Sequence, residues 1–354
     1  EKEQGITYSE DQKIILTTAL NHQIAVLTGG PGTGKTTSIC AILAAFETIG
    51  LETKLCAPTG RAAKRMTELT GREAYTLHRL LGAQMSDADE MTVFNFNEEE
   101  PLSCDAVIVD ECSMVDITLM KALLCALPET CRVVLVGDVD QLPSVGPGKV
   151  FADIINSNAV PTVYLNQIFR QKQDSRIVRF AHEINNGIVP DYSDNKGDFF
   201  RLSRIDPTEC ANTVAELCSE RLPNNMNIPS ERIQILSPTK KGETGTVSLN
   251  KLLQQTLNPA DPTKMEKAFG DIIFREGDRV MQIKNNYDIY WEKGSRNDLR
   301  TYESGTGVFN GEIGRIGKIS TEERQIQVEF DDGKVTWYAF SELDQLEHAY
   351  AITI

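Results

Sequence analysis

The chain has 354 residues, of which 40% are hydrophobic, so it can bury two or three cores, and a single domain of this size would be unusual. Its formal net charge of −15 is unlike the basic balance of proteins whose affinity comes mainly from phosphate contacts. Either the cations are confined to a groove, with acidic residues on the outer faces, or nucleic acid is not a partner at all. Eight cysteines without a C-x-x-C pair and four scattered histidines argue against zinc sites, iron–sulfur sites and a disulfide framework.

The first motif lies between an apolar run at 24–27 and an apolar-periodic segment at 39–46. Residues 29–36 fit G-x-x-x-x-G-K-[ST], which predicts a strand, a phosphate-binding loop and a helix start. Glycines let successive backbone N–H groups turn toward a phosphate, and the positive end of the helix faces the same anion. Lys35 would reach the β- and γ-phosphate oxygens, and Thr36 would ligate Mg²⁺. The predicted nucleotide contacts in this loop are Gly30, Pro31, Gly32, Thr33, Gly34, Lys35, Thr36 and Thr37.

A second apolar strand is followed by Pro58, Thr59, Gly60 and Arg61. Residues 56–65 combine a hydroxyl, free backbone N–H groups and three cations. Such groups suit contacts to the phosphates of a single strand that fix position without reading sequence.

Residues 82–103 interrupt the pattern with acidic runs around a short alternating stretch at 92–97. This segment predicts either a small projecting hairpin or a plain surface loop anchored by Phe94 and Phe96.

Residues 105–111 read Asp-Ala-Val-Ile-Val-Asp-Glu, which predicts a buried parallel strand that delivers two carboxylates at its C-terminal edge. Asp110 would hold Mg²⁺ through water, and Glu111 would orient and deprotonate the attacking water. Together with the phosphate loop, this motif predicts a hydrolase as well as a nucleotide binder.

A further apolar strand, at 132–136, leads into Gly-Asp-Val-Asp-Gln-Leu-Pro. Gln141 is the candidate γ-phosphate sensor, because an amide can bond both a phosphate oxygen and the attacking water. The alternative interpretation is a turn with solvated polar residues.

The second half of the chain changes in character. Strands are expected at 199–202 and 233–236, and Lys240 and Lys241 follow the latter in a turn that could serve as the second lobe's version of the Pro-Thr-Gly turn. Short alternating runs at 279–284, 312–319, 325–330 and 335–340 are separated by Gly- and Asn-containing turns, which predicts a small antiparallel barrel.

The order GGPGTGKTT, CAPTGRAAKRM, TLHRLL, VIVDECSMVD, VGDVDQLPSVGPG and LNQIFRQ resembles the RecD-like branch of the superfamily 1 DNA helicases. Conjugative relaxase-helicases share two of these signatures, but they would require a transesterase domain with a His cluster and a catalytic Tyr. The resemblance runs from about residue 7 to the end of the chain.

The resemblance implies further roles. Gln12 is similar to the adenine-reading glutamine, although the start of a helix capped by Ser9 would also explain it. Arg170 is similar to the arginine that the second lobe presents to the γ-phosphate, where it would neutralise transition-state charge. His78 and Arg79 resemble a second DNA-contact block, although a lone helical His is more often structural. Phe94 and Phe96 would lie in the pin that parts the duplex.

The expected fold class is α/β, with tandem RecA-like P-loop NTPase lobes, each a parallel sheet with helices on both faces, and a small SH3-like β-barrel insertion. The first lobe would span 1–165 with the hairpin insertion at 82–103. An incomplete second lobe would span 166–266 and 341–354, and the barrel 267–340. In the barrel, residues 285–287 and 308–311 sit where the family's DNA-facing loops would be, although such barrels are as often protein-binding or spacer modules.

The sequence thus predicts an ATP- and Mg²⁺-dependent single-stranded DNA translocase and helicase core, for which the resemblance implies five-prime to three-prime polarity and a role in repair or recombination. The alternative is a nucleotide switch, or a motor subunit of an exonuclease complex that does not unwind alone. No apolar run approaches ~18 residues and no signal-peptide pattern opens the chain, which favours a cytoplasmic location without membrane partners.

The sequence ends at residue 354, before the last motifs that the resemblance leads us to expect. We therefore expect a fragment with feeble ATPase activity and no processive unwinding unless another chain supplies the missing strands.

Overall fold

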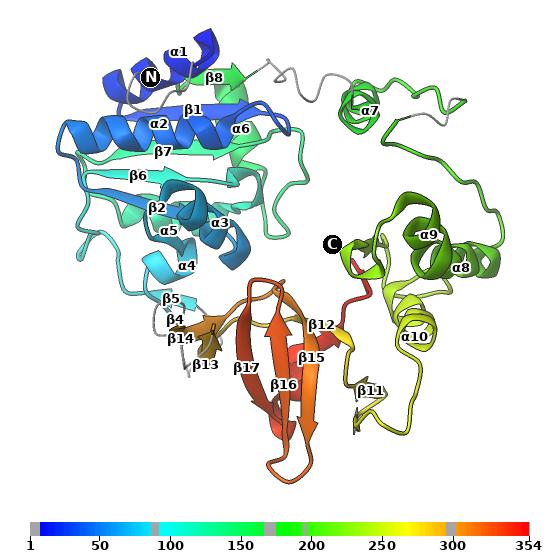
Figure 1. The fold of residues 1–354 in the computed structure, drawn as a ribbon. Coiled ribbons are helices and arrows are strands. Elements are labelled where there is room, and N and C mark those ends of the chain that lie inside the picture. The colour runs from blue at the N-terminus through cyan, green and yellow to red at the C-terminus, as the bar shows by residue number, and fades with distance from the viewer. Residues whose placement is uncertain (1–7, 86–91, 166–174, 194–196, 295–301, 354) are drawn as a thin grey trace. The chain divides into compact units, whose positions relative to one another are not determined.

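The computed structural model describes residues 8–85, 92–165, 175–193, 197–294 and 302–353. The chain divides into two compact units, Glu1–Arg201 and Leu202–Ile354, which are taken in turn (Figure 1). The finer lobe boundaries expected at 165, 266 and 340 remain predictions.

The first unit is built on a parallel sheet with the strand order β3-β2-β6-β7-β1-β8. Its strands are β1 (Ile24–Gly29), β2 (Thr53–Ala57), β3 (Ala74–Thr76), β6 (Ala106–Val109), β7 (Arg132–Gly137) and β8 (Thr162–Leu165). Its helices are α1 (Glu10–Asn21), α2 (Lys35–Thr48), α3 (Gly60–Thr70), α4 (Leu77–Leu80), α5 (Ile117–Cys125), α6 (Val150–Ser157) and α7 (Arg176–Asn185).

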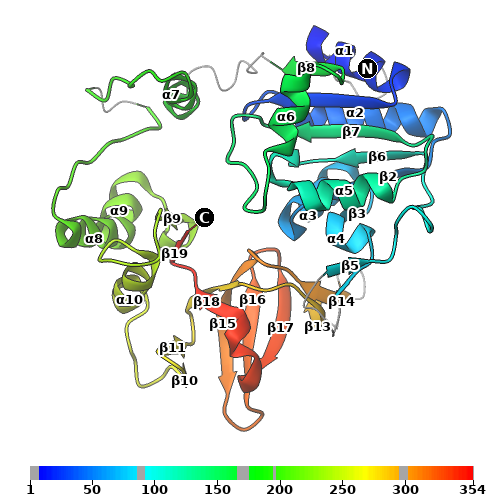
Figure 2. The ribbon, with the colours of Figure 1, turned by 180° about the vertical axis from the view of Figure 1, so that it is seen from behind.

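Helices cover both faces of this sheet, because alternate strand residues point to opposite sides. Ala25 and Leu27 pack into a core with α1, α2 and α3, whereas Val26 joins a core with α4, α5 and α6. Helix α2 lies in front of the sheet in Figure 1, and α5 and α6 lie in front of it in Figure 2. The predicted doubly covered parallel sheet is confirmed.

The segment at 82–103 forms the base of a hairpin, in which β4 (Ala83–Met85) pairs antiparallel with β5 (Thr92–Phe94). Residues 86–91 lie outside the described part of the chain. Phe94 packs against the core of the first unit, with its ring centroid 6.1 Å from that of His78, whereas Phe96 is 37% exposed. Phe94 therefore anchors the hairpin base, and the proposed wedge role of both residues remains a prediction.

The strand predicted at 199–202 is wrong. These residues adopt no regular structure, and the Phe199 ring instead lies edge-on to Phe180 of α7, with 5.0 Å between centroids. Phe199, one of the apolar residues that favoured a strand, instead packs against α7.

The second unit contains a helical part and a barrel, and the bounds of its elements are as follows. The helical part comprises α8 (Pro207–Glu216), a π-helical turn (Leu217–Arg221), α9 (Leu222–Met226), β9 (Ile235–Leu236), α10 (Thr246–Leu257) and β19 (Ala351–Ile352). The remaining strands are β10 (Glu266–Phe269), β11 (Ile272–Arg275), β12 (Arg279–Gln282), β13 (Asn286–Lys293), β14 (Glu303–Val308), β15 (Ile313–Ser320), β16 (Gln325–Phe330), β17 (Lys334–Ala339) and β18 (Leu346–His348).

The barrel strands form an antiparallel sheet with the order β14-β13-β17-β16-β15-β12-β18, around a core that includes Phe274, Val328 and Tyr338. The four predicted runs correspond to β12, β15, β16 and β17, and the predicted small antiparallel insertion is confirmed. Strands β13 and β14 were not predicted. β9 and β19 pair in parallel beside α8 and α10. In neither unit does the described chain contain a helix with the length and apolar character to cross a bilayer.

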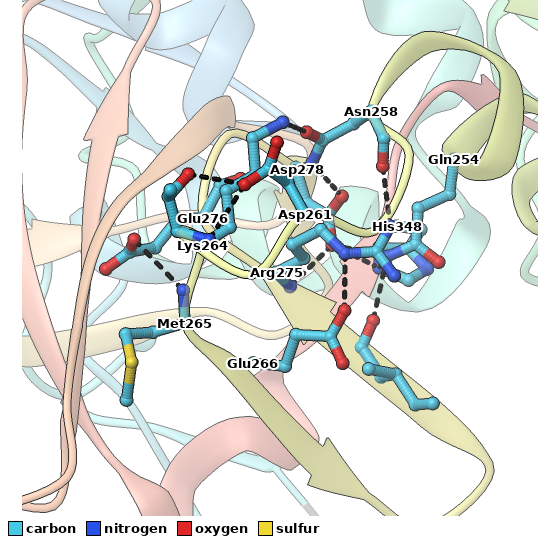
Figure 3. A network of polar contacts seen from close by, with 12 residues as sticks. Gln254, Asn258, Asp261, Lys264, Met265, Glu266, Arg275, Glu276, Asp278 and His348 are labelled. Carbon is cyan, nitrogen blue, oxygen red and sulfur yellow. Dashed lines mark hydrogen bonds and ion pairs between the residues drawn. The ribbon is translucent and has the colours of Figure 1, made fainter.

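A fully buried carboxylate, Asp278, ties the barrel to the helical part of the second unit (Figure 3). It accepts hydrogen bonds from Gln254 Nε2 at 2.6 Å and Asn258 Nδ2 at 2.7 Å, at the end of α10. Tyr350 Oη donates to it at 2.9 Å, and His348 Nε2 lies 3.1 Å away. The helix preceding the barrel and the segment following it therefore meet on one side chain.

Asp278→Asn should lower the free energy of unfolding of the second unit by roughly 3–5 kcal/mol, because buried donors would lose their charged acceptor. The chain's two tryptophans, Trp291 and Trp337, lie on β13 and β17, so their fluorescence during urea unfolding reports on the barrel. The exposed Asp271→Asn change is the control and should leave the transition within about 0.5 kcal/mol. Equal transitions for the two variants would contradict the prediction.

Candidate active site

Three neighbouring strands of the first unit end at one edge of its sheet. β7 pairs in parallel with both β6 and β1, and Leu135 is aligned with Val109 on one side and with Val26 on the other. The residues that follow these strands must therefore emerge side by side, as the sequence predicted.

The loop after β1 has the backbone that its glycines permit. Gly32 and Gly34 have φ values of 78° and 92°, in the left-handed region that side chains disfavour. A Cβ atom on Gly29 would lie 2.7 Å from Thr33 Oγ1 and 2.9 Å from Leu165 Cβ. Thr33 Oγ1 in turn donates to Gly30 O at 2.8 Å, which holds the loop in a closed turn.

Lys35, Thr36 and Thr37 form the first turn of α2, where unpaired N–H groups and the helix dipole favour an anion. The Lys35 ammonium donates to Gly29 O at 2.5 Å and to Gly30 O at 3.2 Å. It thus lies across the loop, within the concavity that a phosphate would occupy.

The loop opens onto a cleft of about 840 Å³ within the first unit. Residues predicted from four separate segments line this one cleft: Gln12, Gly30, Pro31, Gly32, Gly34, Lys35, Thr36, Thr37, Asp110, Glu111 and Gln141. Its volume is in the range of small-ligand sites.

Gln12 takes part in the N-terminal cap of α1 and also bonds the phosphate loop. Its backbone N–H donates to Ser9 Oγ and its side-chain Oε1 accepts from Ser9 N, which completes a capping box at the start of α1. Its Nε2 donates to Gly34 O at 3.3 Å. Gln12 is 2% exposed, so the cap fixes it against the phosphate loop.

The carboxylates of Asp110 and Glu111 follow β6. Asp110 Oδ1 accepts a hydrogen bond from Glu111 N at 2.8 Å, and burial raises the pKa of Asp110. Burial and the neighbouring Asp110 charge raise the pKa of Glu111, while Lys35 opposes both shifts.

Glu111 has an unusual backbone conformation and a buried side-chain oxygen without a hydrogen-bond partner among the described residues. Its φ of 54° is left-handed, a conformation that costs a non-glycine residue free energy. Its Oε2 is buried and has no hydrogen-bond partner among the described residues. This oxygen, which has no partner in the described part of the chain, has room to accept a hydrogen bond from a water or a ligand.

Gln141 lines the cleft from the loop after β7. Its backbone N–H donates to Asp138 O at 3.2 Å, and Val139 N donates to Thr28 Oγ1 on β1 at 3.2 Å. The loop is therefore attached to the end of the phosphate-loop strand. Asp138, 3% exposed, accepts from Asp140 N and shapes the same turn.

Two further residues lie at the site although sequence analysis did not place them there. Arg65 of α3 lines the cleft, and its charge acts on both carboxylates. The spacing of Ala62, Arg65, Met66 and Leu69 on one helical face was the available signal. A Cβ on Gly30 would lie 3.4 Å from His182 Cε1, and His182 Nε2 is buried without a partner among the described residues; no sequence pattern indicated it.

The residues predicted to contact DNA in the first unit follow two paired strands, β2 and β3, whose ends Ala57 and Thr76 are aligned. Thr59 caps α3 by accepting from Ala62 N at 3.2 Å. Pro58 precedes it, Gly60 is buried, and Arg61 is exposed.

His78 and Arg79 lie on α4. Burial lowers the pKa of His78, and the exposed Arg79 guanidinium lies 5.4 Å from the centroid of the Tyr75 ring. Their DNA-binding roles remain predictions.

Lys240 and Lys241 are exposed in the turn between β9 and α10 of the second unit. A Cβ on Gly245 would lie 2.6 Å from Lys240 O and 2.5 Å from Lys241 O, so the turn closes tightly behind them. Arg170 lies outside the described residues.

Two family models match the chain. An AAA domain model matches residues 12–147, and the model described as the ATP-dependent RecD-like DNA helicase SH3 domain matches residues 249–330. The ATP-dependent RecD2 DNA helicase of Deinococcus radiodurans is 37% identical over 98% of this chain and 43% of its own length. The chain belongs to the RecD-like superfamily 1 helicases.

One further relative agrees with this RecD-like assignment, and two solved structures share the fold. The RecBCD enzyme subunit RecD of Mycolicibacterium smegmatis is 42% identical over 41% of this chain and 30% of its own length. The fold is similar to that of Bacteroides Pif1 bound to ssDNA (TM-score 0.53, 20% identity, 98% of this chain and 83% of that one) and of Pif1 helicase from Candida albicans (TM-score 0.53, 18% identity, 98% and 86%). The RecD-like chain spans less than half the length of these curated relatives.

Glu111→Gln should stabilise the first unit at pH 7. Because the pKa of Glu111 is raised in the folded state, ionised Glu111 destabilises the folded protein. This destabilisation is fully present above the folded pKa and is absent below the ordinary value of 4.5, where the carboxyl is protonated in both states. Thermal unfolding followed by circular dichroism should show a higher midpoint for the variant at pH 7 and equal midpoints at pH values below 4.5. The exposed Glu129→Gln change should raise neither midpoint, and a destabilised Glu111→Gln at pH 7 would refute the electrostatic argument.

Proposed function

We propose that this RecD-like chain is the motor core of an ATP-dependent DNA helicase that moves along single-stranded DNA. The observation that carries the proposal is the single cleft in which the phosphate loop, the two carboxylates after β6 and Gln141 meet. The name of its Deinococcus radiodurans relative, which matches nearly the whole chain, supports the same activity.

Each cleft residue has a distinct task in hydrolysis. The loop N–H groups and the start of α2 would hold the β-phosphate of ATP, and Lys35 would leave its carbonyl partners for the phosphate oxygens. Glu111 would take a proton from the attacking water through Oε2, for which the described residues supply no hydrogen-bond partner. Gln141 would orient that water and detect the γ-phosphate.

A divalent cation fits beside these groups. The Thr36 hydroxyl and the Asp110 carboxylate both line the cleft, and hydroxyl and carboxylate oxygens are the ligands that Mg²⁺ prefers. When bound, Mg²⁺ would neutralise charge on the phosphates. Arg170 would add a further positive charge at the γ-phosphate, a role that rests on its motif alone.

DNA binding would use the local cations rather than the overall charge. The net charge of the chain is −15, and the acidic residues Glu98, Glu99, Glu100, Glu322 and Glu323 are all exposed. The exposed Arg61 and the N-terminus of α3 would form a local surface that attracts anions. Pro58, Thr59, Gly60, Arg61, His78, Arg79, Lys240 and Lys241 are the proposed DNA contacts.

A second function has a specific observation in its favour. A RecBCD enzyme subunit RecD is 42% identical over 41% of this chain, which supports a motor subunit whose activity depends on other subunits of an exonuclease complex. Five-prime to three-prime polarity and a role in repair or recombination are part of the first proposal, and tailed duplexes with a single five-prime or three-prime overhang would test the polarity.

ATP turnover by this chain should rise when single-stranded DNA is added, because a motor couples hydrolysis to its track. Lys35→Ala should abolish turnover, and Glu111→Gln should lower kcat by about 10²–10⁴-fold, as expected when a general base is lost. Arg170→Ala should also lower kcat, whereas Arg72→Ala, which removes an exposed arginine paired with Glu47, is the matched control. ATP turnover that single-stranded DNA does not stimulate would favour the subunit function. An unchanged kcat in Arg170→Ala would show that Arg170 does not act at the γ-phosphate.

Arg61→Gln should weaken binding of single-stranded DNA equally for different sequences, since phosphate contacts carry no sequence information. The slope of log affinity against log salt should decrease by about 0.7 for one lost phosphate contact. Fluorescence anisotropy of a labelled oligonucleotide over a salt series measures both quantities, with Arg72→Gln as the control. An unchanged slope would show that Arg61 does not touch the backbone.

A further inference from the structure

A second cavity, of about 310 Å³, lies wholly within the second unit. One wall carries Glu231, and the barrel strands β12 and β15 contribute Arg279 and Arg315. Apolar side chains including Leu257 and Ile235 complete its lining. The volume is at the lower end of the range for small-ligand sites.

The charge around this cavity is opposite in sign to that of the chain. Lys264, Arg279 and Arg315 line it, and Glu231 is the only carboxylate among its lining residues. The Arg315 guanidinium is 3.8 Å from the Glu231 carboxylate, so this pair offsets one of the three positive charges that line the cavity. An anion entering the cavity would meet an excess of positive charge.

Arg279 is incompletely satisfied by the protein. Its side chain is only 12% exposed; one terminal nitrogen donates to Glu231 O at 2.6 Å, and the other lies 3.5 Å from Asp331. Its Nε is buried and has no acceptor among the described residues. A buried N–H group without an acceptor is unfavourable, and an oxyanion in the cavity would supply one.

The wall of the cavity is fixed in advance by the Asp278 network (Figure 3). Lys264 Nζ donates to Asn258 Oδ1 at 2.5 Å, and Asn258 Nδ2 donates to Asp278. Tyr350, which also lines the cavity, donates its hydroxyl to the same carboxylate. Groups held in place before a ligand arrives lose little entropy when it binds.

We propose that this cavity is a phosphate-binding site for one nucleotide, made entirely of residues outside the ATP cleft. Guanidinium groups match phosphate oxygens in geometry and charge, and the apolar lining leaves room for the organic part of the ligand. The phosphate could belong to a nucleotide within single-stranded DNA or to a free mononucleotide. The inference stands apart from the proposed ATPase, since none of its residues takes part in hydrolysis.

Equilibrium dialysis with radiolabelled inorganic phosphate tests the site. Every protein carries Lys35→Ala, which weakens the phosphate loop as a competing site. Arg315→Gln should weaken phosphate binding about tenfold, the effect of losing one charge-assisted hydrogen bond, and Arg315→Lys should restore part of it. Lys318→Gln, an equal charge change at an exposed position of the same strand, should bind like the parent.

Competition then identifies the source of the phosphate. Displacement of phosphate by oligothymidylate alone assigns the site to DNA, and displacement by adenosine monophosphate assigns it to a free nucleotide. Failure of both to compete, or equal phosphate binding by Arg315→Gln and its parent, overturns the proposal. Tryptophan fluorescence confirms that each variant retains the folded barrel. ATP turnover is measured for the same substitutions with Lys35 present, so that loss of phosphate binding at this cavity is distinguished from failure of the proposed ATPase.

Discussion

The parallel hydrogen bonding of β6, β7 and β1 is the constraint on which the candidate active site depends. The central residues of each strand are apolar, and the polar groups of the site lie at or just beyond the C-terminal ends of the strands. The register aligns Val109, Leu135 and Val26, and a shift of one residue would turn core side chains toward the wrong face. The packing of both cores therefore fixes the spacing between the phosphate loop and Glu111, before any ligand contributes.

Much of this site could be predicted from the sequence, because its parts are local. The phosphate loop needs glycines at defined positions, and the carboxylates follow directly from an apolar run. Both signals lie within about ten residues of chain, and parallel strand pairing then brings them together. Arg65 was assigned to DNA rather than to the cleft, because its role depends on how α3 packs beside the loop.

Other features depend on tertiary contacts that no local pattern shows. The run at 199–202 has strand-like composition, but the Phe199 ring is used against Phe180. β14 contains Gly305, where a Cβ would lie 2.7 Å from the Trp291 ring, so a residue that weakens strand propensity is required by the neighbouring strand. No local pattern marks Asp278, and only the fold shows five polar groups converging on its carboxylate.

The convergence on Asp278 also bears on how such a protein can change over evolutionary time. Because α10, the entry strand β12 and the returning segment at His348 and Tyr350 meet at one carboxylate, the start and the end of the intervening barrel are attached to the helical part at one buried point. Exposed loops generally accept changes of length and sequence more readily than buried connections do. Substitutions at Asp278 and its buried partners should therefore be tolerated less well than substitutions on the exposed turns of the barrel.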